Sequence, residues 1–134
     1  MRKILLAAVL SASSFVIAGC APKPPSQVAI STANYGTLPS DYQQQIKNHM
    51  ASILKDPESA RYMFEPPFKG YSQDGSLSST SGGVTYGQIV GVQVNAKNSY
   101  GGYTGNQLYV FMFANGVMYD STANFQYGRV KRAP

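Results

Sequence analysis

The chain has 134 residues, is 43% hydrophobic and carries a formal net charge of +5, with one cysteine and one histidine. This length is sufficient for one small domain, and a single cysteine excludes an internal disulfide. A lone histidine also excludes a metal site built from several histidines, so neither a metal nor another cofactor is expected.

The N-terminal segment has the pattern of an export signal. Arg2 and Lys3 precede an apolar run over residues 4–17, and the run closes at Ile17-Ala18-Gly19-Cys20. A positive start, a short apolar run and small residues at its end are typical of a signal peptide. The run is shorter than the ~20 apolar residues that span a bilayer. An ordinary secretory signal followed by an unrelated cysteine is the alternative.

The residues Ile17-Ala18-Gly19-Cys20 resemble the lipobox of bacterial lipoproteins. The resemblance implies cleavage between Gly19 and Cys20, removal of residues 1–19 as signal peptide, and lipidation of Cys20. Two or three acyl chains would then hold the protein on a membrane, since a single chain anchors only weakly. Ala21 stands where an Asp commonly retains such proteins at the inner membrane. It implies the outer membrane of a Gram-negative host, with the domain facing the periplasm.

Cleavage would also lower the net charge. Without Arg2 and Lys3, nine basic residues face six acidic ones, for a net charge of +3. The nine are scattered along the chain, and only Arg129, Lys131 and Arg132 cluster. A nucleic-acid-binding surface needs a basic stripe, so no nucleic-acid partner is expected.

The mature chain divides into a tether and a single domain. Residues 20–34 hold three prolines and lack hydrophobic periodicity, which predicts a disordered tether, and the lipobox resemblance implies that this tether is lipidated at Cys20. Residues 35–134 form the predicted domain. It begins with a helix over 40–55, with Ser40 as N-cap, because five residues form one apolar stripe: Tyr42, Ile46, His49, Met50 and Ile53.

The rest of the domain is predicted to be antiparallel β structure. The expected strands are 60–64, 84–94, a central strand 108–114, its partner 117–120, and an edge strand near 125–130. Asn115-Gly116 predicts a type I′ turn, and Gly87 and Gly91 indicate either a bulge or a close backbone approach. The Gly- and Ser-rich residues 70–83 indicate a mobile loop. The predicted fold class is therefore α+β, with one N-terminal helix packed on a small antiparallel sheet of three to four strands.

No catalytic site is expected from the ionisable residues. His49 lies on the apolar stripe of the predicted helix, where a structural role is the more common one. Asp56 and Glu58 flank Pro57 and suggest a carboxylate pair, but a turn with solvated acids is the favoured interpretation. A hydrolase that uses these residues is the least favoured hypothesis.

The glycine-rich stretch 95–105 is the candidate ligand-binding segment. Its sequence, NAKNSYGGYTG, lacks the Gly-Lys-Ser/Thr order of a P-loop. Tyr100 and Tyr103 are suited to stacking on a sugar or a peptide, with Lys97 and Asn98 as polar partners. A long connection whose tyrosines cover the core is the alternative.

Two motifs, LKDPESA at 54–60 and NAKNSYGGYTG at 95–105, resemble those of a set of small bacterial envelope lipoproteins with no established activity. The resemblance covers about residues 35–114 and transfers no catalytic role. The loop at 72–83 departs from it, because it is longer than the corresponding connection in that group. It implies an outer-membrane lipoprotein whose non-enzymatic domain binds a protein partner of the cell envelope. A module that binds a cell-wall glycan or a small ligand through the 95–105 stretch is the alternative.

Overall fold

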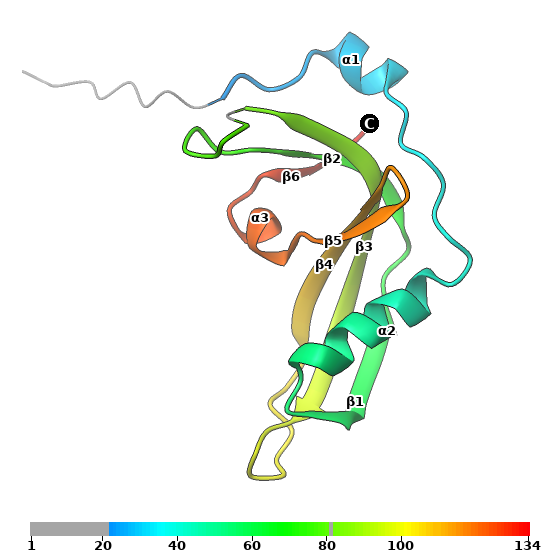
Figure 1. Ribbon diagram of the computed structural model, residues 1–134, viewed down its shortest axis with the longest axis vertical. Coiled ribbons are helices and arrows are strands. Elements are labelled where there is room, and N and C mark those ends of the chain that lie inside the picture. The colour runs from blue at the N-terminus through cyan, green and yellow to red at the C-terminus, as the bar shows by residue number, and fades with distance from the viewer. Residues whose placement is uncertain (1–21, 81) are drawn as a thin grey trace, which may run out of the picture.

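The structure is a computed structural model and describes residues 22–80 and 82–134. The lipobox and Cys20 therefore lie outside the described residues. The described helices are α1 (Gln27–Thr32), α2 (Tyr42–Ile53) and α3 (Thr122–Gln126). The strands are β1 (Asp56–Phe64), β2 (Phe68–Gln73), β3 (Val84–Lys97), β4 (Gln107–Ala114), β5 (Val117–Asp120) and β6 (Val130–Arg132) (Figure 1).

The predicted fold class is wrong, because the domain is mostly β. In the described part of the chain, six strands form one antiparallel sheet, and α1 and α3 have only six and five residues. Residues 70–73 of β2 were assigned above to a mobile loop. Its Gly70 and Ser72 suggested a loop, yet both are buried. A Cβ on Gly70 would lie 2.6 Å from the Lys131 carbonyl oxygen, so close packing requires glycine there.

Strand β3, rather than the 108–114 segment, lies at the middle of the sheet. The strand order is β5-β4-β3-β2-β6, and β1 also pairs with β3. Strand β2 pairs with residues 84–89 of β3 and β1 with residues 92–97, so β3 serves two partners in succession (Figure 1). The 14 residues of β3 have a contour length of about 46 Å at ~3.3 Å per residue. One strand therefore joins the two ends of the molecule.

Helix α2 packs on one face of this sheet. Its Ile46 and Met50 are completely buried and belong to a cluster with Val92 of β3 and Phe111 of β4. The predicted helix over 40–55 is thus confirmed, although its N-cap is Asp41, whose side chain makes no capping hydrogen bond. The opposite face of the sheet buries a second cluster: Ile89, Val110, Met112, Ala114 and Val130.

The hairpin between β4 and β5 has the predicted turn. Ala114 pairs with Val117, and Asn115 and Gly116 have φ of 53° and 75°. Positive φ at both central residues is the requirement of a type I′ turn. At Gly87 the structure shows a close backbone approach, because an added Cβ would lie 2.5 Å from the Phe113 carbonyl oxygen.

Residues 22–34 differ from the disordered tether that their sequence suggested. Ser26 caps α1 by accepting a hydrogen bond from the Ala29 amide at 3.1 Å. Ile30 is buried, and the Tyr35 hydroxyl donates to its carbonyl oxygen at 2.6 Å. Local capping and one buried apolar side chain thus order a segment that has no long hydrophobic period. None of the described helices is long and apolar enough to cross a membrane.

Candidate functional site

Residues 95–97 of the predicted ligand-binding segment end β3, and residues 98–105 lie in the loop between β3 and β4, at the end of the molecule away from α1 (Figure 1). Asn98 shapes this loop from within. Its Oδ1 accepts hydrogen bonds from the backbone amides of Tyr100 at 2.9 Å and Gly102 at 3.2 Å. Gly101 has a φ of 81°, which a residue with a side chain rarely adopts. The side-chain oxygen of Asn98 is therefore a structural group rather than a free ligand-binding atom.

Tyr103 lies at the base of the loop, where cations surround its ring. The Arg61 guanidinium lies 4.4 Å from the ring centroid and the Lys97 ammonium 5.6 Å. The Tyr103 hydroxyl donates to the Ser59 carbonyl oxygen of β1 at 3.2 Å. Strand β1 therefore supports the loop through both Arg61 and Ser59.

Tyr100 lies at the turn of the same loop and is 97% exposed, whereas Tyr103 is 40% exposed. We call Arg61, Lys97, Tyr100 and Tyr103 the tip cluster. It combines two of the residue types enriched at protein interfaces, tyrosine and arginine. Three of its members were predicted, but Arg61 was not. Arg61 comes close to Tyr103 because Arg61 of β1 pairs with Asn95 of β3, and no local sequence signal reveals that pairing.

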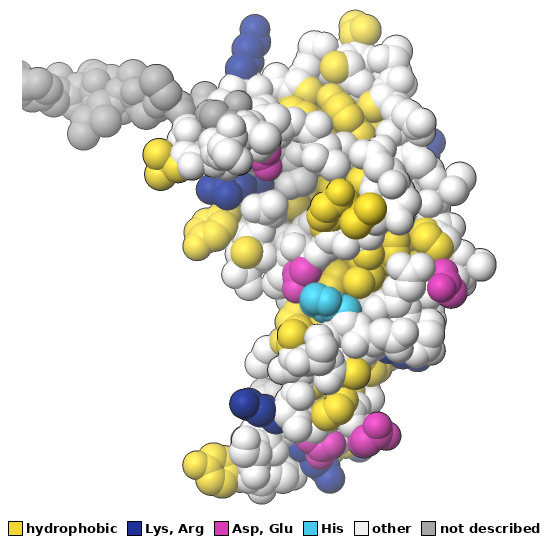
Figure 2. Space-filling view, in the orientation of Figure 1, with side chains coloured by type: hydrophobic (Ala, Val, Ile, Leu, Met, Phe, Trp, Pro, Cys, Tyr) yellow, Lys and Arg dark blue, Asp and Glu magenta, His cyan; other side chains and the backbone are white. Residues whose placement is uncertain are grey.

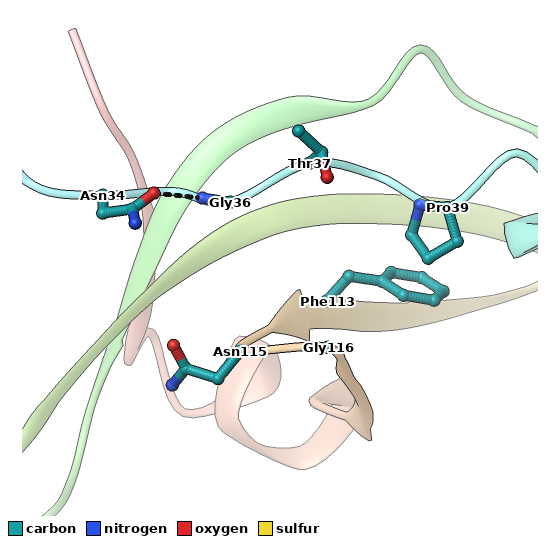
Figure 3. Close-up of a pocket in the computed structure, with 7 residues that line it drawn as sticks. All are labelled: Asn34, Gly36, Thr37, Pro39, Phe113, Asn115 and Gly116. Carbon is teal, nitrogen blue, oxygen red and sulfur yellow. Dashed lines mark hydrogen bonds between the residues drawn. The ribbon is translucent and has the colours of Figure 1, made fainter.

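A groove lies between the α1–α2 connection and the β4–β5 hairpin, with a volume of about 450 Å³. Figure 3 shows the Pro39 ring beside that of Phe113, with the side chains of Asn34 and Asn115 toward the other end. The remaining lining residues are Gly36, Thr37 and Gly116, so none of the described residues that line the groove is charged. Its chemistry suits a neutral ligand with groups that hydrogen-bond to amides.

The structure gives His49 a partner that the sequence did not suggest. Its Nε2 lies 3.3 Å from Oδ2 of Asp120 at the end of β5, and its ring meets that of Phe111 edge-on at 5.5 Å. Ser52, one turn further along α2, donates its hydroxyl to the His49 carbonyl oxygen at 2.6 Å. The Ser52 hydroxyl therefore donates its hydrogen to the backbone of α2. The contact between His49 and Asp120 links α2 to β5.

Asp56 and Glu58 lie in β1, not in the solvated turn expected for them. Asp56 Oδ1 accepts from the Ser59 amide at 3.3 Å, and Asp56 pairs with Lys97 in the sheet register. Among residues 22–80 and 82–134, no group of three or more His, Cys, Asp or Glu side chains is placed to hold a metal ion.

Comparison with known proteins adds no identity to these sites. The chain matches no protein-family model, and neither a curated protein nor a solved structure is significantly similar to it. The lipobox and the two motifs therefore remain sequence-based predictions.

Proposed function

We propose that this protein is a lipoprotein of the outer membrane whose non-enzymatic periplasmic domain binds a protein partner of the cell envelope through the tip cluster. The observation that carries the proposal is the position of the tip cluster relative to the N-terminal segment. Tyr100 is almost fully exposed, and its loop lies at the opposite end of the sheet from the N-terminal segment that leads to Cys20 (Figure 1). A membrane anchor at one end leaves the other end free to meet a partner.

The residues of the tip cluster suit such an interface physically. Tyrosine and arginine dominate binding hot spots, because they offer a large contact area together with hydrogen-bond donors. The Arg61 and Lys97 cations lie 4.4 and 5.6 Å from the centroid of the Tyr103 ring, contacts that restrict these long side chains before a partner binds. Preorganised side chains lose less conformational entropy on binding.

The anchor is tested by the mass of the mature N-terminus. Protein extracted from membranes should begin at Cys20 and carry acyl groups on that residue. Cys20→Ala should abolish the acyl mass and the lipoprotein-type cleavage. A membrane-extracted chain that begins elsewhere, or an unmodified Cys20, would remove the lipoprotein assignment.

The partner surface is tested by photo-cross-linking in intact cells, with the photoreactive amino acid at position 100. Leu77, which is 100% exposed and lies in the loop between β2 and β3, is the matched control position. We expect one reproducible adduct from position 100, none of the same mass from position 77, and loss of the adduct when Arg61→Ala removes the support of Tyr103. Identical adducts from both positions, or an adduct that persists in Arg61→Ala, would contradict the proposal.

A second candidate function is the binding of a cell-wall glycan or of a small neutral ligand. The observation that favours it is the uncharged groove lined by Asn34, Thr37 and Asn115. Sedimentation with purified peptidoglycan distinguishes the two surfaces. Thr37→Trp fills the groove, whereas Tyr100→Ala alters only the loop. Retention equal to that of the parent protein in both variants would exclude the glycan function.

A further inference from the structure

We infer that the anchor-proximal end of the domain binds the anionic phospholipid headgroups of the membrane directly. We call its four cations the basic face: Lys23, Lys69, Arg129 and Lys131. The inference rests on the proposed lipid anchor for its setting. Headgroup binding itself is a property of the folded chain and can be measured without the lipid.

The pairing of β2 with β6 gathers three of these cations. Tyr71 pairs with Lys131, and the Ala133 amide donates to the Lys69 carbonyl oxygen at 2.9 Å. The Gln73 amide donates to the Arg129 carbonyl oxygen at 3.1 Å, which continues this alignment. Residues directly opposite each other, and alternate residues along a strand, share a face of a sheet. Lys69, Arg129 and Lys131 therefore share one face.

The N-terminal segment adds the fourth cation. The Gln73 side-chain amide donates to the Lys23 carbonyl oxygen at 2.6 Å, which brings this segment onto the end of β2. Pro22 and Pro24 line the same hollow of about 290 Å³ as Arg129 and Lys131. Figure 2 shows Lys and Arg side chains on both sides of the place where the described chain begins.

The charges of the basic face are not neutralised within the fold. All four side chains are exposed, and among the described residues no salt bridge joins any of them to a carboxylate. Among the described residues that line the hollow, Asp74 is the one acid, and it accepts a hydrogen bond from the Thr80 hydroxyl. Tyr127 lines the hollow too, is 74% exposed and has the Arg129 guanidinium 5.2 Å from its ring centroid. Tyrosine is enriched at membrane–water interfaces, where its amphipathic ring lies at the level of the headgroups.

The covalent connection sets how close this surface comes to the membrane. Pro22 follows Cys20 by two residues, and two residues span roughly 7 Å at full extension. The lipidated residue would therefore hold the hollow within about one Debye length of the headgroups, which is ~8 Å at physiological ionic strength. At that distance each Lys or Arg is expected to strengthen binding to an anionic surface by roughly fivefold.

Co-sedimentation with vesicles tests this inference on the mature chain from residue 20 carrying Cys20→Ser, which removes lipid anchoring. We expect salt-sensitive binding to vesicles of phosphatidylethanolamine with one-third phosphatidylglycerol, and little binding to neutral phosphatidylcholine vesicles. The double variant Lys69→Gln/Lys131→Gln should bind roughly 25-fold more weakly, as two cations are lost. Lys47→Gln/Lys55→Gln, which removes the same charge from the α2 region, should stay within about twofold of the parent.

Several results would overturn the inference. These are no binding of the parent chain to the anionic vesicles, equal binding to neutral vesicles, or equal losses in the two double variants. Circular dichroism and thermal melting of each variant verify that it is folded. On the lipidated protein, slower hydrogen exchange of β6 in anionic than in neutral vesicles gives a second measurement, and unchanged exchange counts against headgroup contact.

The two proposals fail separately. An unmodified Cys20 in cells removes the anchor but leaves vesicle binding by the basic face intact. Conversely, a lipidated Cys20 without charge-dependent vesicle binding would support the proposed anchor and contradict headgroup binding by the basic face. Equal losses in the two double variants would instead leave the basic face to another occupant, such as an acidic protein partner.

Discussion

Met50→Ala tests whether the apolar stripe of α2 holds this helix on the sheet. Met50 is 0% exposed and belongs to the core cluster with Val92 and Phe111. The substitution removes three heavy atoms from a filled region, and neighbouring strands fixed by pairing relax only partly into the space. A fully buried Met→Ala change costs about 2–5 kcal/mol. The total stability of a small domain is about 5–15 kcal/mol, so this loss is large.

Met63→Ala provides the matched control, because it removes the same atoms from a side chain of β1 that is 58% exposed. A surface change of this kind is expected to cost less than about 0.5 kcal/mol. Urea unfolding followed by circular dichroism measures both variants, and equal slopes would allow the midpoints to be compared directly. Equal losses in the two variants, or a Met50→Ala protein as stable as the parent, would refute this account of how α2 is held.

Three further predictions concern the sheet, a buried tyrosine and the His49–Asp120 pair. Gly87→Ala should cost about 1–3 kcal/mol in urea unfolding, because the new Cβ meets backbone 2.5 Å away, whereas Gly102→Ala, whose nearest atom is 3.8 Å away, should change little. Burial raises the pKa of Tyr35 above 10.0, and neighbouring tyrosines raise it further. The resulting stability is present below pH 10 and is lost as the pH rises through the folded-state pKa. Tyr35→Phe should therefore weaken the alkaline decline in melting temperature, and an unchanged decline would contradict this assignment. Asp120→Asn should lower the free energy of unfolding by at most about 1 kcal/mol, because the paired His49 and Asp120 side chains are 34% and 35% exposed. A larger loss on thermal melting would contradict this estimate and show that the pair is structurally essential.

The two proposed surfaces give the molecule a direction relative to the membrane. The basic face lies at the β2–β6 end, and the tip cluster lies at the far end of β3 (Figure 1). The contour of β3 between them is about 46 Å. Headgroup binding would thus hold the tip cluster away from the bilayer, where an envelope partner can reach it.

Short-range patterns predicted the elements that local chemistry determines. The apolar stripe around Ile46 and Met50 predicted α2, since a helix buries one face at a spacing of three and four residues. Asn115-Gly116 predicted the hairpin, because these residues tolerate the positive φ of its turn. The candidate residues Lys97 and Tyr103 were likewise found together at the predicted loop.

Long-range pairing accounts for what these patterns missed. The sequence of β2 contains Gly70 and Ser72, which favour loops locally, and it becomes a strand because β3 and β6 pair with it on both sides. Arg61 likewise reaches Tyr103 because β1 pairs with β3 and places Arg61 opposite Asn95.

Local preference is a weak signal in β structure, since a strand is stabilised by partners that lie far along the chain. The main helix and the turn could therefore be obtained from the residues alone, whereas the N-terminal signal stays a prediction from the sequence. The sheet order and the tip cluster arise only when β3 brings distant segments side by side, and the basic face arises only when β6 pairs with β2.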